Sequence, residues 1–343
     1  MKRLLFCILL CLVFNSYSCS TNETPIRDYW PTVEWKTSLP ETQGMESTVL
    51  QGIDDFVKKK LPQTSSLLVV RNGYIVLERY YDDNPEKSRW MWSATKGVLS
   101  SLVGIAIDKG NIRSTNQRMI DFFHDYSKER INKKAYNITL HHLLTMSDGI
   151  SHQEMDINFG EEKLVADFRA NPGSESFYNS MSPQIVSIII TIATGKTALD
   201  FAKEYLFEPI GIQRVSWDEI GGHTRGAYGL ALTTRDMAKI GYLFLNRGFW
   251  DSVSVIPIHW VMKCSTRQII NKQFNEFYRD YGYYWWIHPI KGHYAYYAEG
   301  YGGQFIVVVP DLDLVAAITS DERTLDDEKY LSILSDIIVP AIR

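Results

Sequence analysis

Cysteine is scarce in this sequence of 343 residues, which contains only four. Cys7, Cys11 and Cys19 lie near the N-terminus, and only Cys264 belongs to the body of the chain. Because one thiol cannot form an intrachain bridge, a disulfide scaffold is excluded. Most lone cysteines are buried and inert, and nothing in the sequence around Cys264 marks it as a nucleophile.

Signals of several common binding and enzyme classes are also missing. The net charge is −4 and no basic stretch is interleaved with aromatic residues, so we expect no nucleic-acid partner. No G-x-S-x-G motif supports an α/β-hydrolase nucleophile elbow. The eight histidines include no H-E-x-x-H motif, and the neighbouring His141 and His142 would diverge on a helix. We therefore expect no metal site and no cofactor.

Long hydrophobic runs are missing as well. The apolar run from Leu4 to Phe14 is shorter than the roughly 20 residues that a membrane-spanning helix needs. It follows a basic start and precedes small residues, a pattern typical of a secretory signal peptide. Cys19 stands where a bacterial lipoprotein carries its lipidated cysteine, although Ser16 replaces the usual aliphatic residue.

We therefore expect residues 1–18 to be a signal peptide of the lipoprotein type and residues 19–45 to be an N-terminal extension. The protein would be exported, either to the periplasm or as a lipoprotein of a bacterial envelope. In that case it contacts the membrane only through a lipid on Cys19. The alternative is ordinary signal-peptidase cleavage near Cys19, with no lipid added.

Strand-like patterns occur at both ends of the body, and helical patterns lie between them. A hairpin is predicted from two apolar-rich runs joined by Asn72-Gly73, a strong two-residue turn signal. The predicted strands cover residues 66–71, 74–80, 283–287, 294–299, 304–309 and 314–320, with a turn at 310–313 between the last two. The predicted helices cover residues 46–60, 93–109, 183–193, 198–206 and 326–342.

This arrangement predicts an α+β fold for residues 46–343. An antiparallel sheet would be built from both chain ends and flanked by helices, with a mostly helical subdomain inserted at about residues 115–245. A parallel α/β fold would need strands that alternate with helices throughout the chain, and that alternation is missing.

The first chemical signal is Ser93-Ala94-Thr95-Lys96 at the predicted start of a helix. Residues three apart on a helix lie on the same face. The positive end of the helix dipole favours an alkoxide on Ser93 and disfavours a protonated Lys96. A desolvated lysine at that place can be neutral near pH 7 and accept the serine proton. Taken alone, the tetrapeptide more often indicates a capping serine and a surface lysine.

Three further segments strengthen the chemical interpretation. They are I-T-L-H-H-L-L-T-M-S-D-G at 138–149, P-G-S-E-S-F-Y-N-S at 172–180 and G-L-A-L-T-T-R-D-M-A-K at 229–239. With the S-x-x-K motif, they resemble the serine β-lactamase and penicillin-binding-protein family, specifically its class C-like branch. The resemblance extends over residues 46 to 340. It implies a β-lactamase/transpeptidase-like fold with the site between the helical subdomain and the sheet.

The resemblance also implies roles for individual residues. Ser93 would be the acylated nucleophile, Lys96 its activating partner, and Tyr178 a relay for protons to and from the leaving group. Which of Lys96 and Tyr178 is the main base stays open. The backbone N–H groups of Ser93 and Tyr301 would form the oxyanion hole. For Tyr178 alone, the alternative is a core tyrosine with a bonded hydroxyl.

The sequence departs from the family pattern in two motifs. The second motif is Tyr178-Asn179-Ser180 instead of Tyr-x-Asn, so Ser180 becomes a candidate substrate-binding residue. The third motif is A-E-G-Y-G-G-Q at 298–304, which lacks the family cation and adds the negative charge of Glu299. The cation that would bind a β-lactam or peptide carboxylate is thus absent, and a like charge stands nearby, so we expect no β-lactam turnover. Three glycines would let the backbone approach the acyl group and are further substrate-binding candidates: Gly300, Gly302 and Gly303.

These departures are more similar to esterases and 6-aminohexanoate-dimer (nylon-oligomer) hydrolases than to true β-lactamases. The aromatic segment 281–286 also resembles that branch. Its side chains either line an acyl pocket or divide between core and surface, and the second account is expected for most of them.

The leading hypothesis is an exported serine hydrolase that cleaves an ester or amide bond in a small molecule or short oligomer. A peptidoglycan D-alanyl carboxypeptidase or a β-lactamase is the second enzymatic interpretation. A non-catalytic ligand-binding or sensor protein of the envelope is the third, because a fold alone does not fix a function. The oligomeric state stays open.

Overall fold

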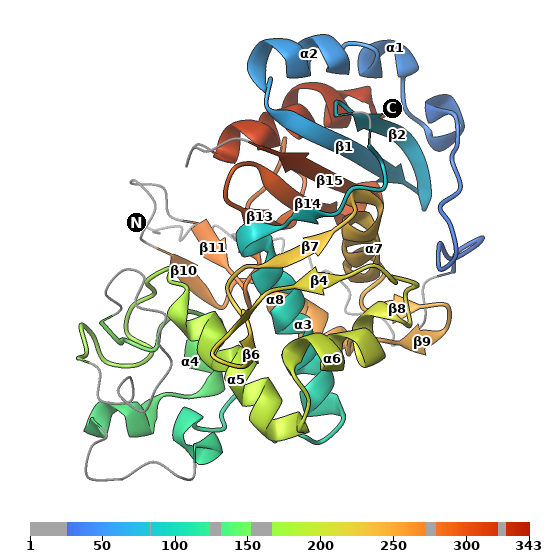
Figure 1. The fold of residues 1–343 in the computed structure, drawn as a ribbon. Coiled ribbons are helices and arrows are strands. Elements are labelled where there is room, and N and C mark those ends of the chain that lie inside the picture. The colour runs from blue at the N-terminus through green and yellow to red at the C-terminus, as the bar shows by residue number, and fades with distance from the viewer. Residues whose placement is uncertain (1–25, 83, 124–131, 152–166, 272–278, 322–326) are drawn as a thin grey trace, which may run out of the picture.

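The computed structural model describes residues 26–82, 84–123, 132–151, 167–271, 279–321 and 327–343. Its centre is an antiparallel eight-stranded sheet that joins both chain ends (Figure 1). In spatial order the strands are β10 (Ile269–Asn271), β11 (Arg279–Tyr281), β12 (Trp286–Ile287), β13 (Tyr296–Gly300), β14 (Gln304–Val309), β15 (Leu314–Ser320), β1 (Thr64–Arg71) and β2 (Tyr74–Tyr80). The predicted α+β architecture is confirmed.

Helices cover both faces of this sheet, as Figure 1 shows. On one face lie α3 (Thr95–Asp108) and α7 (Thr234–Leu245), and on the other lie α1 (Ser47–Leu50), α2 (Ile53–Lys60) and the C-terminal turns. The contact with α7 is close, because a Cβ added at Gly241 would lie 2.6 Å from the side chain of Val315. On the opposite face the ring of Tyr330 packs against Phe305, with ring centroids 6.5 Å apart.

The central part of the chain is mostly helical and packs against α3. It contains α4 (Leu140–Leu144), α5 (Met181–Thr194), α6 (Ala198–Ala202) and α8 (Ile258–Ser265). The short strands are β3 (Arg89–Trp90), β4 (Ser216–Trp217), β5 (Glu219–Ile220), β6 (His223–Thr224), β7 (Leu230–Leu232), β8 (Phe249–Trp250) and β9 (Val253–Ser254). Residues 95 to 106 of α3 are all buried, so this helix forms the seam between the sheet and the helical part.

Most of the predicted elements are found, and the predicted hairpin is one of them. Asn72 and Gly73 take left-handed φ angles of 52° and 87°, as a tight hairpin turn requires. The predicted strand 283–287 is wrong in length, because a turn at Tyr284 (φ 66°) leaves only β12 paired with the sheet. The predicted opening helix is divided into α1 and α2.

Two other segments also differ from the prediction. The predicted C-terminal helix is a series of short 3-10 and π turns over Asp327–Leu331, Leu334–Ile338 and Val339–Ala341. Helix α7 lies in the predicted insertion by sequence, yet it packs on the sheet, next to β14 and β15. By its packing, α7 therefore belongs to the sheet part of the fold.

The described part of the predicted N-terminal extension packs on the body of the protein. Arg27 forms an ion pair with Asp313 (2.5 Å), and the ring centroids of Trp30 and Trp250 lie 5.5 Å apart. The predicted leader and Cys19 lie outside the described residues. Among the residues described, no single helix is long and apolar enough to span a membrane. Helix α5 and the following helical segment Ala198–Phe207 meet these two criteria only when they are taken together, and the chain bends by 73° between them.

Candidate active site

Ser93 lies in the turn that connects β3 to α3. The N–H group of Met91 donates to the carbonyl oxygen of Leu230 (2.8 Å), which ties the chain to β7 just before the turn. Trp92 then takes a left-handed φ of 45°. Such a conformation costs about 1–3 kcal/mol and is often found at functional sites. The turn leaves Ser93 half-buried, two residues before the first residue of α3.

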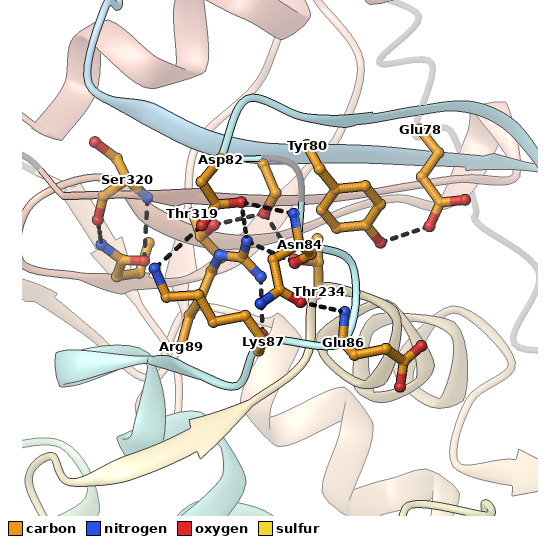
Figure 2. Close-up of polar contacts among 12 residues, drawn as sticks. Glu78, Tyr80, Asp82, Asn84, Glu86, Lys87, Arg89, Thr234, Thr319 and Ser320 are labelled. Carbon is orange, nitrogen blue, oxygen red and sulfur yellow. Dashed lines mark hydrogen bonds and ion pairs between the residues drawn. The ribbon is translucent and has the colours of Figure 1, made fainter.

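Buried Arg89 holds the loop that leads into this turn (Figure 2). Its guanidinium donates to the carboxylate of Asp82 (2.5 Å) and to the carbonyl oxygens of Asn84 (3.0 Å) and Lys87 (2.8 Å). Hydrogen bonds that involve charged groups are stronger than those between neutral groups. The Arg89 side chain therefore holds together the loop that precedes Ser93.

Lys96 and Ser93 form the pair that the S-x-x-K spacing predicts. The Lys96 amine donates to Ser93 Oγ at 2.8 Å and to the carbonyl oxygen of Ala227 at 3.0 Å. Lys96 is only 1% exposed, and this burial lowers the pKa of its amine from 10.5 to about 7. Burial disfavours the charged form of an amine, so a large neutral fraction exists near neutral pH. The alternative of a surface lysine is wrong.

Tyr178 lies beside this pair, in the loop that precedes α5. Lys96 Nζ is 4.8 Å from the centroid of the Tyr178 ring, which stacks on Trp286 with centroids 5.6 Å apart and an interplanar angle of 25°. Asn179 caps α5, because its Oδ1 accepts from the N–H groups of Met181 (2.9 Å) and Ser182 (2.8 Å). The structure thus brings Ser93, Lys96 and Tyr178 together.

Ser180 is exposed at the residue before α5, and it makes no side-chain hydrogen bond that caps the helix. Its predicted contact with substrate therefore stays a prediction.

The segment 138–149 supports the loop that carries Tyr178. The Asp148 carboxylate accepts from the Ser182 hydroxyl (2.5 Å) and from the N–H group of Ile150 (2.9 Å). Ser176 Oγ donates to the carbonyl oxygen of Thr145 (3.0 Å). Through these hydrogen bonds, the segment 138–149 holds the chain on both sides of the second motif at 178–180.

The third motif packs directly against the turn that carries Ser93. A Cβ added at Gly300 would lie 2.1 Å from the carbonyl oxygen of Met91, so only glycine allows this approach. The Tyr301 ring lies 5.5 Å from the ring of Trp92, measured between centroids. The end of β13 and the start of α3 are therefore neighbours, which is the arrangement that the predicted oxyanion hole needs.

Gly302 and Gly303 form the turn between β13 and β14, with φ angles of 79° and 91°. A Cβ added at Gly303 would lie 2.5 Å from the Tyr330 ring. Turn geometry and packing thus explain this glycine, whereas the predicted contact of Gly302 and Gly303 with the acyl group stays a prediction.

The negative charge of Glu299 is compensated, which corrects the expectation of an unbalanced charge in the third motif. Arg279 Nη1 lies 3.2 Å from Glu299 Oε2, and the two side chains are 10% and 16% exposed. Arg279 comes from β11, which is two strands away from β13 in the sheet. A cation is thus present near this motif, but it is already paired with a carboxylate.

The aromatic segment 281–286 is buried throughout, so the predicted division between core and surface is wrong. The four aromatic side chains of residues 283–286 and that of Tyr281 are all less than 5% exposed. The tight turn at Tyr284 turns consecutive rings inward, which strict strand alternation would not do. Of these rings, Trp286 and Tyr281 contact Tyr178.

Sequence reasoning missed the residues on the other side of Ser93. The Tyr228 ring lies 6.3 Å from Trp92, and Arg225 Nη1 donates to the Tyr228 hydroxyl (2.5 Å). Ala227, between them, provides the carbonyl oxygen that accepts from Lys96. These residues directly precede the G-L-x-x-T-x-x-D-x-A-K stretch at 229–239. That position was the sequence signal from which their place near Ser93 could have been predicted.

Other candidate centres lie apart from this cluster. Cys264 is fully buried, which raises the pKa of its thiol to about 12, as expected for an inert cysteine. No group of three or more histidine, cysteine or acidic side chains suited to a metal ion occurs in the described part of the chain. A hollow of about 770 Å³ lies between the segment 26–36 and the turn at Asp251 and Ser252. None of Ser93, Lys96 and Tyr178 lines it.

Sequence comparisons find proteins that are similar to this chain. The family model described as Beta-lactamase matches residues 53–335. An uncharacterized protein of Alkalihalophilus pseudofirmus is 21% identical over 292 residues, which cover 74% of this chain and 82% of that protein.

Solved structures show the same fold. "Putative 6-aminohexanoate-dimer hydrolase from Bacillus anthracis" superposes with a TM-score of 0.72 at 20% identity, over 90% of this chain and 87% of the other. A family VIII carboxylesterase superposes with a TM-score of 0.71 at 14% identity, over 89% and 99%. A β-lactamase/transpeptidase-like fold is therefore confirmed.

Proposed function

Because this chain belongs to the beta-lactamase family, we propose that it is a serine hydrolase that cleaves an ester or amide bond through an acyl-enzyme on Ser93. One observation carries the proposal: a fully buried Lys96 amine lies 2.8 Å from Ser93 Oγ, and burial lowers its pKa to about 7. An amine that is neutral at working pH and bonded to a serine hydroxyl is a suitable base for that hydroxyl.

Acylation follows from this arrangement. Ser93 Oγ attacks the carbonyl carbon of the substrate, and its proton passes to the neutral amine of Lys96. The carbonyl oxygen becomes an oxyanion, which the N–H groups of Ser93 and Tyr301 stabilise by about 3–4 kcal/mol each. When the carbon–oxygen or carbon–nitrogen bond breaks, the leaving group takes a proton through the Tyr178 hydroxyl, and the Lys96 amine becomes neutral again.

Deacylation repeats these steps with water as the nucleophile. Water attacks the acyl carbon, and its proton moves to the Lys96 and Tyr178 pair. The bond to Ser93 Oγ then breaks, the oxygen recovers its proton, and a carboxylic acid leaves. Whether Lys96 or Tyr178 takes the first proton depends on how the two groups share it.

The surroundings of the cluster favour substrates that carry an apolar group next to the cleaved bond. Trp92, Tyr228 and Tyr301 place aromatic rings beside Ser93. Arg279, the cation that contacts the third motif, is paired with Glu299, so a substrate carboxylate would have to displace that partner. These features support ester or amide cleavage over β-lactam or D-alanyl-peptide turnover.

The test is covalent labelling of the mature protein with a fluorophosphonate serine probe, read by intact-protein mass. We expect one adduct on the wild type and none on Ser93→Ala. If the folded wild type stays unmodified while a related hydrolase is labelled under the same conditions, the protein is a binding or sensor protein. Turnover of penicillin by the labelled protein would instead favour a β-lactamase.

We further propose that the protein is exported and held at the bacterial envelope by a lipid on Cys19. The apolar run before Cys19 and the polar residues after it support this proposal. Metabolic labelling with palmitate should mark the wild type and not Cys19→Ser. Recovery of the unlabelled wild type from the soluble cytoplasmic fraction would refute export.

A further inference from the structure

A series of stacked groups connects an ion pair on the sheet to the candidate base. The Arg279 guanidinium carbon lies 5.6 Å from the centroid of the Trp286 ring. Trp286 stacks on Tyr178, and the Tyr178 ring lies next to the Lys96 amine. These contacts lead step by step from β11 to the residue that activates Ser93.

Arg279 reaches across the strand that carries Trp286. Strand β12 lies between β11 and β13 in the sheet, and Arg279 is on β11. Its Nη1 donates to Glu299 Oε2 (3.2 Å) and lies 3.3 Å from the hydroxyl of Tyr297, both on β13. The side chain is therefore anchored beyond Trp286 and passes over its ring. Such a cross-strand anchor restrains the rotamer of Trp286.

Tyr178 depends on this aromatic surface because its backbone lies in a loop. Its ring contacts Trp286 in a stacked geometry and Tyr281 edge-on, with centroids 6.4 Å apart. The hydroxyl lies in the plane of the ring, so a stacked partner that fixes the plane of the ring confines the hydroxyl to that plane. A displacement of about 1 Å at a reacting group can lower a rate about 100-fold.

We propose that Arg279 is a positioning residue: by holding Trp286 against Tyr178, it keeps the Tyr178 hydroxyl in place for proton transfer to the leaving group. The inference rests on the proposed function of Ser93. A purely structural role of the Arg279–Glu299 pair predicts a different result: its loss would change the stability of the fold, without a selective effect on proton transfer to the leaving group.

The test compares two variants in which an ion pair is neutralised. In Arg279→Met/Glu299→Gln both charges are removed together, so that no buried charge is left unpaired. The matched control is Arg235→Met/Glu78→Gln, which removes an ion pair of 2.7 Å between α7 and β2. Figure 2 shows Glu78 on β2, where it also accepts a hydrogen bond from the Tyr80 hydroxyl. Strand β2 forms the edge of the sheet opposite to β10 and β11.

The readout is kcat/KM for phenyl butyrate and p-nitrophenyl butyrate, because both esters give the same butyryl-enzyme and kcat/KM reports the acylation step that releases the phenol. Phenol is the poorer leaving group and needs more help from a proton donor. We expect the Arg279→Met/Glu299→Gln variant to lose about tenfold in kcat/KM on the phenyl ester and less on the p-nitrophenyl ester. Arg279→Lys should recover most of the loss, and the control variant should keep wild-type values.

A second comparison tests whether Arg279 acts through Trp286. In a Trp286→Leu background, which already lacks the stacked ring, neutralising the Arg279 pair should have little further effect, because the two changes act on one contact. Equal losses of kcat/KM on both esters, full additivity with Trp286→Leu, or an unchanged kcat/KM would each overturn the role of Arg279. Absence of a fluorophosphonate adduct on Ser93 in the wild type would instead refute the proposed function itself.

Discussion

Replacing Lys96 by methionine should abolish the activated serine and stabilise the protein in the same step. The native state holds this amine at a pKa of about 7, whereas the unfolded chain returns it to about 10.5. Between these two values the unfolded state binds more protons than the native state, so the stability of the wild type rises with pH. Below about pH 7 both states are protonated, and the full penalty of a buried charge is present.

The size of the effect follows from the burial of the amine. The difference between the two pKa values corresponds to about 5 kcal/mol, of which about 4 kcal/mol applies at pH 7. The methionine variant loses the hydrogen bond to Ala227 and leaves that carbonyl oxygen unsatisfied, which costs about 1–3 kcal/mol. We therefore expect the free energy of unfolding at pH 7 to increase by about 1–3 kcal/mol.

The free energy of unfolding is measured by urea unfolding of the wild type and Lys96→Met at about pH 7 and about pH 9.5. Fluorophosphonate labelling of both proteins is measured in parallel. The free-energy difference between Lys96→Met and the wild type should fall by about 3 kcal/mol at the higher pH. The native amine is then neutral, and the pH lies only about one unit below the pKa of 10.5 in the unfolded chain, so little of the penalty is left. Wild-type labelling should rise about tenfold per pH unit below pH 7 and level off above it. Ser93→Ala, which keeps the buried amine, should show no such gain in stability. A stability difference that does not change with pH would refute the assignment of a neutral lysine.

Two further substitutions test other parts of the site, and one labelling experiment tests a buried thiol outside it. Tyr178→Phe should lower kcat for phenyl butyrate about 10²–10⁴-fold, with an unchanged thermal unfolding midpoint because the ring still stacks on Trp286; wild-type turnover would exclude the hydroxyl from proton transfer. Gly300→Ala should lose about 1–3 kcal/mol of stability and most fluorophosphonate labelling, since its Cβ would lie 2.1 Å from the Met91 carbonyl oxygen; normal Tm and labelling would contradict this contact. Cys264 should resist iodoacetamide until the protein unfolds, because burial raises the pKa of its thiol to about 12, and rapid alkylation of the native protein would show that the thiol is accessible.

Local patterns predicted the sheet well where the turn chemistry is strong. Strands β2, β14 and β15 match the predicted ranges, because Asn72-Gly73 and the turn after Val309 define their ends. The strands β10 and β11 were not predicted, and β12 was placed too early. These strands are only two or three residues long, and their pairing depends on neighbours that a local pattern does not contain.

In the candidate site too, contacts between residues close in the sequence were predicted, and contacts between distant residues were missed. The spacing of Ser93 and Lys96 placed both on the same face of one turn, as observed. The partner of Glu299 was missed, because Arg279 is 20 residues away in the sequence and reaches β13 across an intervening strand. Nothing in a motif shows which charge will compensate another across a sheet.

The proposed reactivity of Ser93 therefore does not follow from the S-x-x-K motif alone. The same four residues at the start of an exposed helix would keep a charged lysine, which cannot accept a proton. Here residues 95 to 106 of α3 are buried on all sides, because the sheet, α5 and α8 surround the helix. That apolar enclosure removes water from Lys96, and this loss of hydration is the physical reason why we propose that a common tetrapeptide acts here as a nucleophile and its base.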